Sequence, residues 1–155
     1  KRLRSALQLF GLDCVANNLK KVVPGIYRLV LCCSATHVAL ANEAMDAVMA
    51  GEFIEHIYDQ DVPATLNEFF RILKKNGVLL LTTPNPDFLL WKLTGGSPLG
   101  GPHVSLHYPR SLENALKTAG FSRITIVGSG IVSSFLGTHF PFFSLYGSYL
   151  VIAYK

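Results

Sequence analysis

The chain has 155 residues, half of them hydrophobic, and a mean hydropathy of +0.34. A chain of this length can form one domain around a single apolar core, and it needs neither disulfides nor a structural metal to fold. The high hydropathy is typical of a parallel sheet buried on both faces, because its strands are continuous apolar runs. No apolar run reaches the ~18 residues that a membrane-spanning helix requires, so we expect no membrane span.

The formal net charge is +4 and the isoelectric point is about 9.1. Such a charge would suit a nucleic-acid partner if the basic residues were gathered on one face. They occur instead in short, separate groups: Lys1-Arg2-Arg4, Lys20-Lys21 and Lys74-Lys75. The last two pairs lie where helices are predicted to end, and cations there complement the helix dipole. We therefore do not expect a nucleic-acid partner.

The cysteines Cys14, Cys32 and Cys33 are odd in number and lack the spacing of metal ligands. Two of them are adjacent within an apolar run, which is typical of buried thiols in a reducing compartment. The basic start of the chain, KRLRSALQLF, leads into a predicted strand and lacks the pattern of a cleavable signal peptide. These features predict a cytoplasmic protein.

The first third of the chain is predicted to form two strands joined by a short helix. The elements are a strand from Ala6 to Leu12, a helix from Ala16 to Val22 and a strand from Tyr27 to Cys33. The first strand is followed by Asp13 and the second by Ser34 and Ala35. Residues that directly follow strands of a parallel sheet lie at its carboxyl edge, where ligands bind in such folds.

The central stretch, from Met45 to Asn85, has the pattern of a strand, a helix and a second strand. The strands are predicted from Met45 to Ala50 and from Val78 to Leu81. Between them, the span from Val62 to Lys74 carries apolar residues at three- and four-residue spacing, which predicts one buried helical face. Asn76-Gly77 is expected to end this helix, because a residue with positive φ is needed after its last turn.

The last third contains a long loop, a helix and two strands. The loop from Pro84 to Leu106 is expected to hold a short amphipathic helix that either roofs a substrate pocket or packs as a small apolar cluster. The later elements are a helix from Ser111 to Ala119, a strand from Phe121 to Val127 and a strand from Ser148 to Tyr154. Alternating strands and helices predict an α/β fold.

Four segments together resemble the class I S-adenosylmethionine-dependent methyltransferases of the small-molecule type: GLD, MDAVMAGEFIEHI, EFFRILKKNGVLLLTTPN and HVSLHYPRSLENALKTAGF. The combination is more specific than any one segment. The resemblance implies a Rossmann-like methyltransferase fold of three layers, αβα, with a mostly parallel sheet and an antiparallel C-terminal strand. It also implies S-adenosylmethionine as the cofactor and a small molecule as the methyl acceptor.

The resemblance assigns cofactor contacts to Asp13, Ser34, Ala35, Gly51 and Glu52. Asp13 would accept hydrogen bonds from the two ribose hydroxyls, since a carboxylate offers two oxygens in one plane; the alternative is that it caps the helix that follows. Ser34 stands where relatives carry an acid that binds the adenine amino group, and Ala35 allows close approach of the ring. Gly51 and Glu52 would lie near the methyl group.

Glu52, Glu55 and His56 form the pattern E-x-x-E-H, and two carboxylates with one imidazole are a ligand set for Mg²⁺, Mn²⁺ or Fe²⁺. Some relatives hold a divalent metal with such a motif and a later histidine, and His103 stands at that position. Other relatives carry Glu-His without metal, and we adopt that interpretation: no bound metal, with His56 and His103 orienting or deprotonating the acceptor.

The resemblance also predicts that the domain, residues 1–155, is incomplete at its N-terminus. Relatives carry a glycine-rich loop after a strand that precedes GLD, and no G-x-G occurs before Gly11. The favoured function is transfer of a methyl group to a small apolar or aromatic acceptor. The alternative is a noncatalytic methyltransferase-like module that binds a partner through the aromatic insertion from Phe135 to Tyr146.

Overall fold

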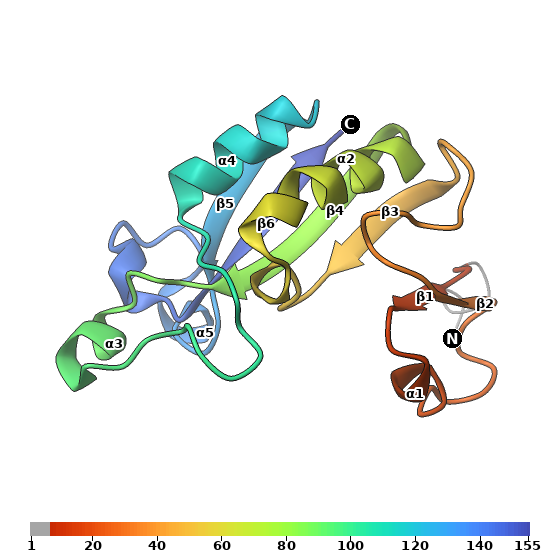
Figure 1. Cartoon of the computed structure of the whole chain (residues 1–155). Helices are drawn as coiled ribbons and strands as arrows, with labels where there is room; N and C mark the ends of the chain where they lie inside the picture. Colours follow the sequence, from red (N-terminus) through yellow and green to blue (C-terminus); the bar gives the residue numbers. More distant parts are fainter. Residues whose placement is uncertain (1–6) are drawn as a thin grey trace.

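The structure is a computed structural model that describes residues 7–155, apart from the side chain of Leu136. Its strands form two sheets (Figure 1). One is the parallel pair β1 (Phe10–Asp13) and β2 (Leu29–Cys32). The other has the order β3-β4-β6-β5, built from β3 (Met45–Ala50), β4 (Leu73–Pro84), β6 (Ser148–Tyr154) and β5 (Ser122–Ser129).

The four-stranded sheet combines parallel and antiparallel pairing. β3 runs parallel to β4, with Ala50 opposite Leu81 at the carboxyl ends of the two strands. β6 lies between β4 and β5 and is antiparallel to both. The expected Rossmann-like α/β fold with an antiparallel C-terminal strand is therefore confirmed.

The β1–β2 pair lies beside β3 but is not hydrogen-bonded to it among the described residues, so β1 and β3 each have an unpaired edge (Figure 1). An apolar cavity of about 170 Å³ lies between the two sheets, with Gly11 and Leu12 on one wall and Val48 and Met49 on the other. The described residues, 7–155, form no strand between β1 and β3. The N-terminal incompleteness of the domain stays a prediction. The segment from Lys1 to Ala6, including the start of the predicted first strand, lies outside the described residues.

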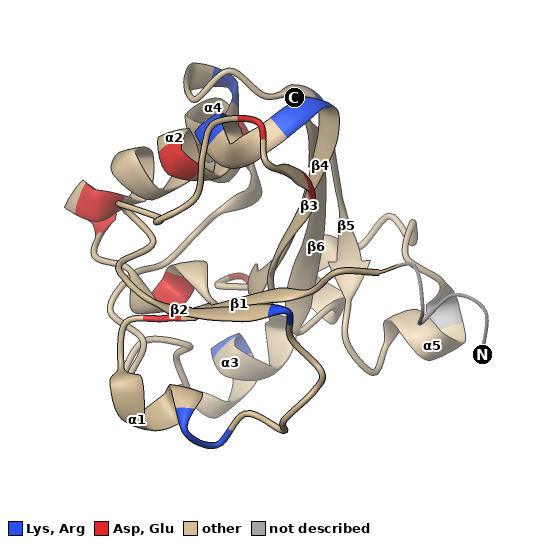
Figure 2. Ribbon diagram, turned by 90° about the vertical axis from the view of Figure 1, so that its right-hand side faces the viewer, with Lys and Arg blue, Asp and Glu red and all other residues tan. Residues whose placement is uncertain are grey.

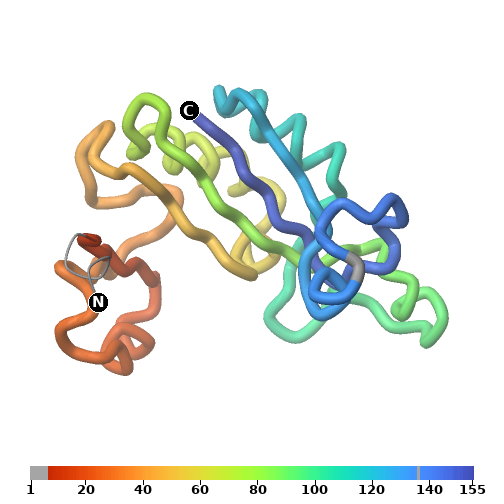
Figure 3. Tube along the Cα trace, turned by 180° about the vertical axis from the view of Figure 1, so that it is seen from behind, coloured from red at the N-terminus to blue at the C-terminus, as the bar shows by residue number. Residues whose placement is uncertain are grey.

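The helices α2 (Val62–Ile72) and α4 (Pro109–Thr118) lie on one face of the four-stranded sheet (Figure 2). Their buried side chains, such as Leu66 and Leu112, share one core with Leu79, Leu81 and Val151 of the strands. The opposite face is seen from behind in Figure 3, where the strands lie in front of α2 and α4. Met49 is 81 % exposed on β3. Residues 7–155 thus supply one of the two helical layers expected on the sheet.

The shorter elements lie around the ends of the strands. They are α1 (Ala16–Leu19), η1 (Ile54–His56), η2 (Asp59–Asp61), α3 (Leu89–Thr94), α5 (Ser133–Leu136) and η3 (Phe143–Leu145). The first helix is shorter than expected, and the short helix predicted within the long loop is present as α3. No helix among the described residues has the length and apolar character needed to span a bilayer.

The end of α2 differs from the prediction. The helix stops at Ile72, and the chain continues directly into β4 through Leu73, whose backbone is extended. Asn76 does have the predicted positive φ, 64°, but it lies within β4, where its N–H donates to the carbonyl of Lys155. Gly77 is needed for close packing: a Cβ there would lie 2.8 Å from the carbonyl oxygen of Lys74. The Asn76-Gly77 pair therefore forms a bend within β4, and it does not cap α2.

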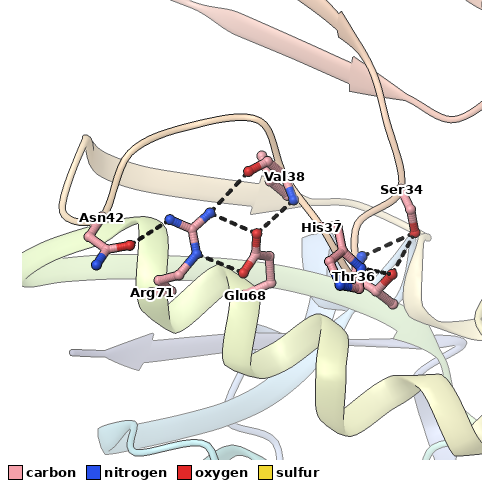
Figure 4. A network of polar contacts seen from close by, with 7 residues as sticks. All are labelled: Ser34, Thr36, His37, Val38, Asn42, Glu68 and Arg71. Carbon is pink, nitrogen blue, oxygen red and sulfur yellow. Dashed lines mark hydrogen bonds and ion pairs between the residues drawn. The ribbon is translucent and has the colours of Figure 1, made fainter.

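A polar network ties α2 to the segment that connects β2 to β3 (Figure 4). The Arg71 guanidinium donates to both carboxylate oxygens of Glu68 at 2.7 Å, to the carbonyl of Val38 at 3.0 Å and to Asn42 at 2.6 Å. Glu68 also accepts from the Val38 N–H at 2.6 Å. The hydrogen bonds from Arg71 hold the pKa of the Glu68 carboxyl below its ordinary value.

We predict that Glu68→Gln lowers the free energy of unfolding by about 1–2 kcal/mol, because charge-assisted hydrogen bonds are lost. The folded-state pKa of Glu68 is below the unfolded value of 4.5. The carboxylate's contribution is therefore fully present above that value and is lost as the pH falls through the folded-state pKa. Urea unfolding of both proteins between neutral and acid pH measures the difference.

The matched control is Glu113→Gln. Glu113 pairs with Lys117 on the exposed surface of α4, at 2.6 Å and four residues apart. Exposed pairs of this kind contribute about 0.3–0.5 kcal/mol. A difference between wild type and Glu68→Gln that does not shrink at acid pH would contradict the prediction.

Candidate functional site

The carboxyl ends of β3 and β4 place a strained residue at the edge of the sheet. Glu52 follows β3 with φ of 44°, which side chains other than glycine adopt rarely. Its N–H donates to both the carbonyl oxygen and the hydroxyl of Thr82, at 3.0 and 2.9 Å. Burial raises the pKa of the Glu52 carboxyl, and a hydrogen bond with Thr82 opposes this shift. Strain of this kind is concentrated at functional sites.

Glu55 lies on η1 and is only 2 % exposed. Its Oε2 accepts a hydrogen bond from the Thr83 hydroxyl at 3.1 Å. Its Oε1 is buried and has no hydrogen-bond partner among the described residues. A buried carboxylate oxygen without a partner is costly, and in native proteins it usually indicates a missing ligand, ion or water.

His56 and His103 lie edge to face, with ring centroids 4.9 Å apart. The Nδ1 of His56 is 3.0 Å from the carbonyl oxygen of Pro102, and the Nδ1 of His103 is 2.7 Å from that of Pro98. A carbonyl oxygen can only accept, so both Nδ1 atoms carry the proton. The Nε2 atom of each neutral ring is therefore left with a free lone pair.

The loop that carries His103 is fixed to η1 by its backbone. The N–H groups of Val104 and Ser105 both donate to the carbonyl oxygen of Glu55, at 2.8 and 3.2 Å. The Ser105 hydroxyl and the ring of His107 both contact the carbonyl oxygen of Ile54, at 3.2 and 3.1 Å. These contacts bring His103, which is about fifty positions away in the sequence, next to the Glu-x-x-Glu-His segment.

Sequence reasoning did not single out Ser105 or His107, although both follow His103 in the segment HVSLHYP. His107 is buried, and burial lowers the pKa of its imidazole, while its hydrogen bond to the Ile54 carbonyl opposes the shift. Ser105 is 2.8 Å from the His107 Nε2. The pair supports the loop and does not itself extend into open space. The available signal for these two residues was the spacing of His103, Ser105 and His107 at every second position.

Asp13 lies at the end of β1, as predicted, and is half-buried. One carboxylate oxygen accepts from the Val15 N–H at 2.7 Å and the other from the Asn18 amide at 3.0 Å. These contacts form a local turn before α1, and the N-cap residue of that helix, Val15, makes no side-chain cap hydrogen bond. Each carboxylate oxygen has two lone pairs, so the two contacts leave capacity for two further donors, as two ribose hydroxyls would require.

Ser34 and Ala35 follow β2. The Ser34 hydroxyl shares a hydrogen bond with the Thr36 hydroxyl at 2.8 Å and accepts from the Thr36 N–H at 3.2 Å (Figure 4). Ala35 is buried and lines the cavity between the two sheets. Ser34 is therefore held by a local turn, whereas Ala35 forms part of the cavity wall.

The structure brings some of the predicted cofactor residues together and not others. Ala35 lines the cavity, and so do Leu12 and Ala50, the direct neighbours of Asp13 and Gly51. The side chains of Asp13, Ser34 and Glu52 are not part of its lining. The cavity of about 170 Å³ is smaller than the roughly 300–1,000 Å³ typical of ligand pockets. By contrast, Glu55, His56 and His103 form a compact cluster, with one potential ligand atom from each within 4.8 Å of the others.

The family profile described as "Methyltransferase domain" matches residues 3–126, which is most of the chain. This chain belongs to the methyltransferase domain family. Family membership implies S-adenosylmethionine as the cofactor, in agreement with the resemblance seen in the sequence.

Relatives of this methyltransferase domain include a "Probable S-adenosylmethionine-dependent methyltransferase" of Mycolicibacterium smegmatis, 33% identical over 82 residues. That alignment covers 53% of this chain and 30% of the relative, so the chain spans less than a third of that protein. A crystal structure of a SAM-dependent methyltransferase from Archaeoglobus fulgidus is similar with a TM-score of 0.73 and 19% identity, covering 94% of this chain and 75% of the other. A methyltransferase structure from Thermotoga maritima, described as a possible histamine N-methyltransferase, has a TM-score of 0.70 and 19% identity, with coverages of 94% and 72%.

The described residues fit the adenosyl part of this cofactor by their chemistry. Asp13 retains acceptor capacity at the end of β1, and Ala35 presents a small buried side chain after β2. Among the described residues, no observation assigns a contact with the methionine part.

We predict that Glu52→Gly stabilises the protein by about 0.5–1 kcal/mol, because glycine adopts a positive φ without the cost that a side chain incurs. The same substitution removes a carboxylate from the edge of β3, and we expect the affinity for S-adenosylhomocysteine to fall. Thermal unfolding and isothermal calorimetry measure the two effects.

The matched control is Glu43→Gly, since Glu43 also has a positive φ, 54°, and lies before β3. Glu43→Gly should stabilise the protein to a similar extent and leave cofactor affinity unchanged. Equal losses of affinity in the two variants would refute a local role of Glu52.

Proposed function

We propose that the protein transfers a methyl group from S-adenosylmethionine to a small, apolar or aromatic acceptor. The observation that carries the proposal is the paired imidazoles of His56 and His103, both with Nε2 free, at the carboxyl end of the sheet in a methyltransferase domain. The bound cofactor supplies an electrophilic methyl group on a sulfonium. The protein's part is to orient the acceptor and to remove its proton.

The backbone contacts of the two imidazoles suit them to this task. Each Nδ1–H is held by a proline carbonyl, Pro102 for His56 and Pro98 for His103, which fixes the ring and leaves Nε2 as the base. A base tethered in this way can accept a proton from an acceptor hydroxyl or amine at a defined place. Glu52 lies close enough to interact electrostatically with both histidines. Their effect is to lower the pKa of the Glu52 carboxyl, but burial has the larger effect and raises it.

The apolar or aromatic nature of the acceptor is supported by the segments around the cluster. α3 leaves Leu90 and Leu93 exposed, and the insertion between β5 and β6 leaves Phe142 exposed. Asn85 is fully buried at the end of β4 and donates to the carbonyl oxygens of Phe143 and Tyr146. The insertion is therefore attached to the strand end that carries the site, and its aromatic side chains suit an apolar acceptor.

A cytoplasmic location is part of this proposal. Cys14 and Cys32 are exposed free thiols, and Cys33 is half-buried and also free. Exposed thiols persist in a reducing compartment and are oxidised outside it. The sequence predicted buried thiols, because two of the cysteines lie in an apolar run. That prediction is wrong for Cys14 and Cys32, which are exposed.

We predict that Asp13→Asn weakens binding of S-adenosylhomocysteine about tenfold, since a hydrogen bond to a charged acceptor contributes roughly 1.5 kcal/mol or more. Asparagine keeps one acceptor oxygen for the Val15 N–H and loses the contact with the Asn18 amide, so the free energy of unfolding should fall by about 1 kcal/mol or less. Asp46→Asn is the matched control, because Asp46 is exposed and pairs with Lys74 at 2.9 Å. Calorimetry on the three proteins separates the two interpretations: unchanged affinity in Asp13→Asn would leave Asp13 with only its contacts in the turn before α1.

We further predict that His103→Ala lowers kcat by about 10²–10⁴-fold, the usual contribution of a positioned base, while cofactor affinity is retained. His139→Ala serves as the control, since His139 is exposed in the insertion and bonded to Thr138. The assay follows methyl transfer from labelled cofactor to a panel of phenols and aromatic amines. A kcat of His103→Ala equal to that of the control would exclude His103 as the base.

A second function, a noncatalytic module that binds a protein partner, is favoured by one observation. Ile131 and Phe135, in the segment between β5 and β6, are each 83 % exposed. Contiguous exposed apolar surface is typical of interaction sites. Calorimetry with S-adenosylmethionine and S-adenosylhomocysteine discriminates the two functions: absence of heat from the protein with both ligands would favour the module and reject the enzyme.

A further inference from the structure

We propose that a cavity between α4, β5 and the insertion that precedes β6 is a second ligand site, and that it takes a small carboxylate with an aromatic or apolar body. The cavity has a volume of about 520 Å³, within the roughly 300–1,000 Å³ typical of ligand pockets. Its lining comes from the loop after β4, the start of α4, the strand β5 and η3. None of the residues assigned above to the cofactor or the acceptor belongs to this lining.

The cavity lies away from the end of β3, where Glu52 follows the strand. One of its walls is on β5, and β3 and β5 are the opposite edges of the four-stranded sheet (Figure 1). Neighbouring strands are about 4.8 Å apart, so these two edges are separated by roughly 14 Å. A ligand in the cavity would therefore bind in addition to the cofactor, at a place of its own.

One wall of the cavity is apolar. Ile124 and Ile126 are two residues apart on β5, so their side chains point to the same face of the sheet. Both are half-buried and pack against the core. Phe143 on η3 is 36 % exposed and adds an aromatic ring to the lining. A wall of this kind suits the flat, apolar body of a small ligand.

The cavity is held in shape by Asn85, which is fully buried at the end of β4. Its amide nitrogen donates to the carbonyl oxygens of Phe143 and Tyr146, at 2.9 and 2.8 Å. Its amide oxygen accepts from the Asp87 N–H at 2.8 Å and from the Tyr149 hydroxyl. Asp87 and Phe143 both line the cavity, so one satisfied polar side chain fixes two parts of its wall.

The charges around the cavity leave one cation without a partner. Asp87 and Glu113 belong to the lining, and each is paired with a lysine outside it: Lys92 at 2.9 Å and Lys117 at 2.6 Å. Arg110 belongs to the lining too, and within residues 7–155 it forms no ion pair. The two carboxylates are thus compensated by their lysines, and the arginine favours an anionic ligand.

The stability of α4 does not explain Arg110. This residue lies in the first turn of the helix, where the helix dipole disfavours a cation. Its exposed guanidinium can form two parallel hydrogen bonds with a carboxylate. Tyr108, which is 45 % exposed, adds a hydroxyl to the same lining. The carboxylate of the ligand would bind Arg110, and its apolar body would lie against Ile126 and Phe143.

The test is calorimetry with three probes that share one ring system: 2-naphthoate, the neutral 2-naphthalenemethanol and the cationic 2-naphthylmethylamine. We expect one equivalent of naphthoate to bind, at least tenfold more tightly than either of the other probes, because hydrogen bonds to a charged group are about twice as strong as neutral ones. Equal affinity for the three probes, or a preference for the amine, would overturn the proposal. The measurement needs neither cofactor nor methyl acceptor, so its result is independent of the proposed function.

Variants of Arg110 locate the site. Arg110→Gln should weaken naphthoate binding at least tenfold, and Arg110→Glu should reverse the preference, so that the amine binds more tightly than naphthoate. A carboxylate in the first turn suits the helix dipole, so Arg110→Glu should fold. Arg123→Gln is the matched control and should bind like wild type, because Arg123 lies over the ring of Tyr154 and outside the lining. Wild-type naphthoate affinity in both Arg110 variants, or an equal loss in Arg123→Gln, would reject the site.

Discussion

The parallel pairing of β3 with β4 is the constraint on which the candidate site depends. With Ala50 opposite Leu81, the chain leaves β3 at Gly51 just where Thr82 and Thr83 follow on β4. Thr82 then receives the N–H of Glu52, and Thr83 donates to Glu55. A shift of one residue in this register would exchange the two threonines between the faces of the sheet, and Glu55 would lose its partner.

The helical layer stabilises that register from one side. α2 begins soon after η1, so the segment from Gly51 to Asp61 is held between a strand and a helix whose buried side chains share one core. Arg71 and Glu68 extend the attachment to the connection between β2 and β3. The loop that carries His103 then docks on η1 through the backbone N–H groups of Val104 and Ser105 and through the side chains of Ser105 and His107. Main-chain carbonyl oxygens accept all of these contacts, so the backbone of η1 positions the loop.

Much of the fold could be predicted from the sequence. Continuous apolar runs indicate buried strands, and apolar residues at three- to four-residue spacing indicate a buried helical face. The strands from Met45 to Ala50 and Ser148 to Tyr154 are observed with the predicted bounds. The end of α2 was missed, since the Asn76-Gly77 pair has the same signature in a strand bend as in a helix cap. The hydrogen-bond partners of His56 and His103 are carbonyls of distant prolines, and no local pattern encodes them. The roles of Asp13, Ser34, Ala35, Gly51 and Glu52 stay predictions.

The separation of the two sheets has an energetic consequence. β1 and β2 have four residues each, and an isolated two-stranded pair is at best marginally stable in water. Asp13 and Ala35, to which the resemblance assigns contacts with the adenosyl moiety, therefore lie on the part of the molecule that opens most easily. Any ligand that binds them must also supply the free energy to order this pair, so its measured affinity would understate the strength of its contacts.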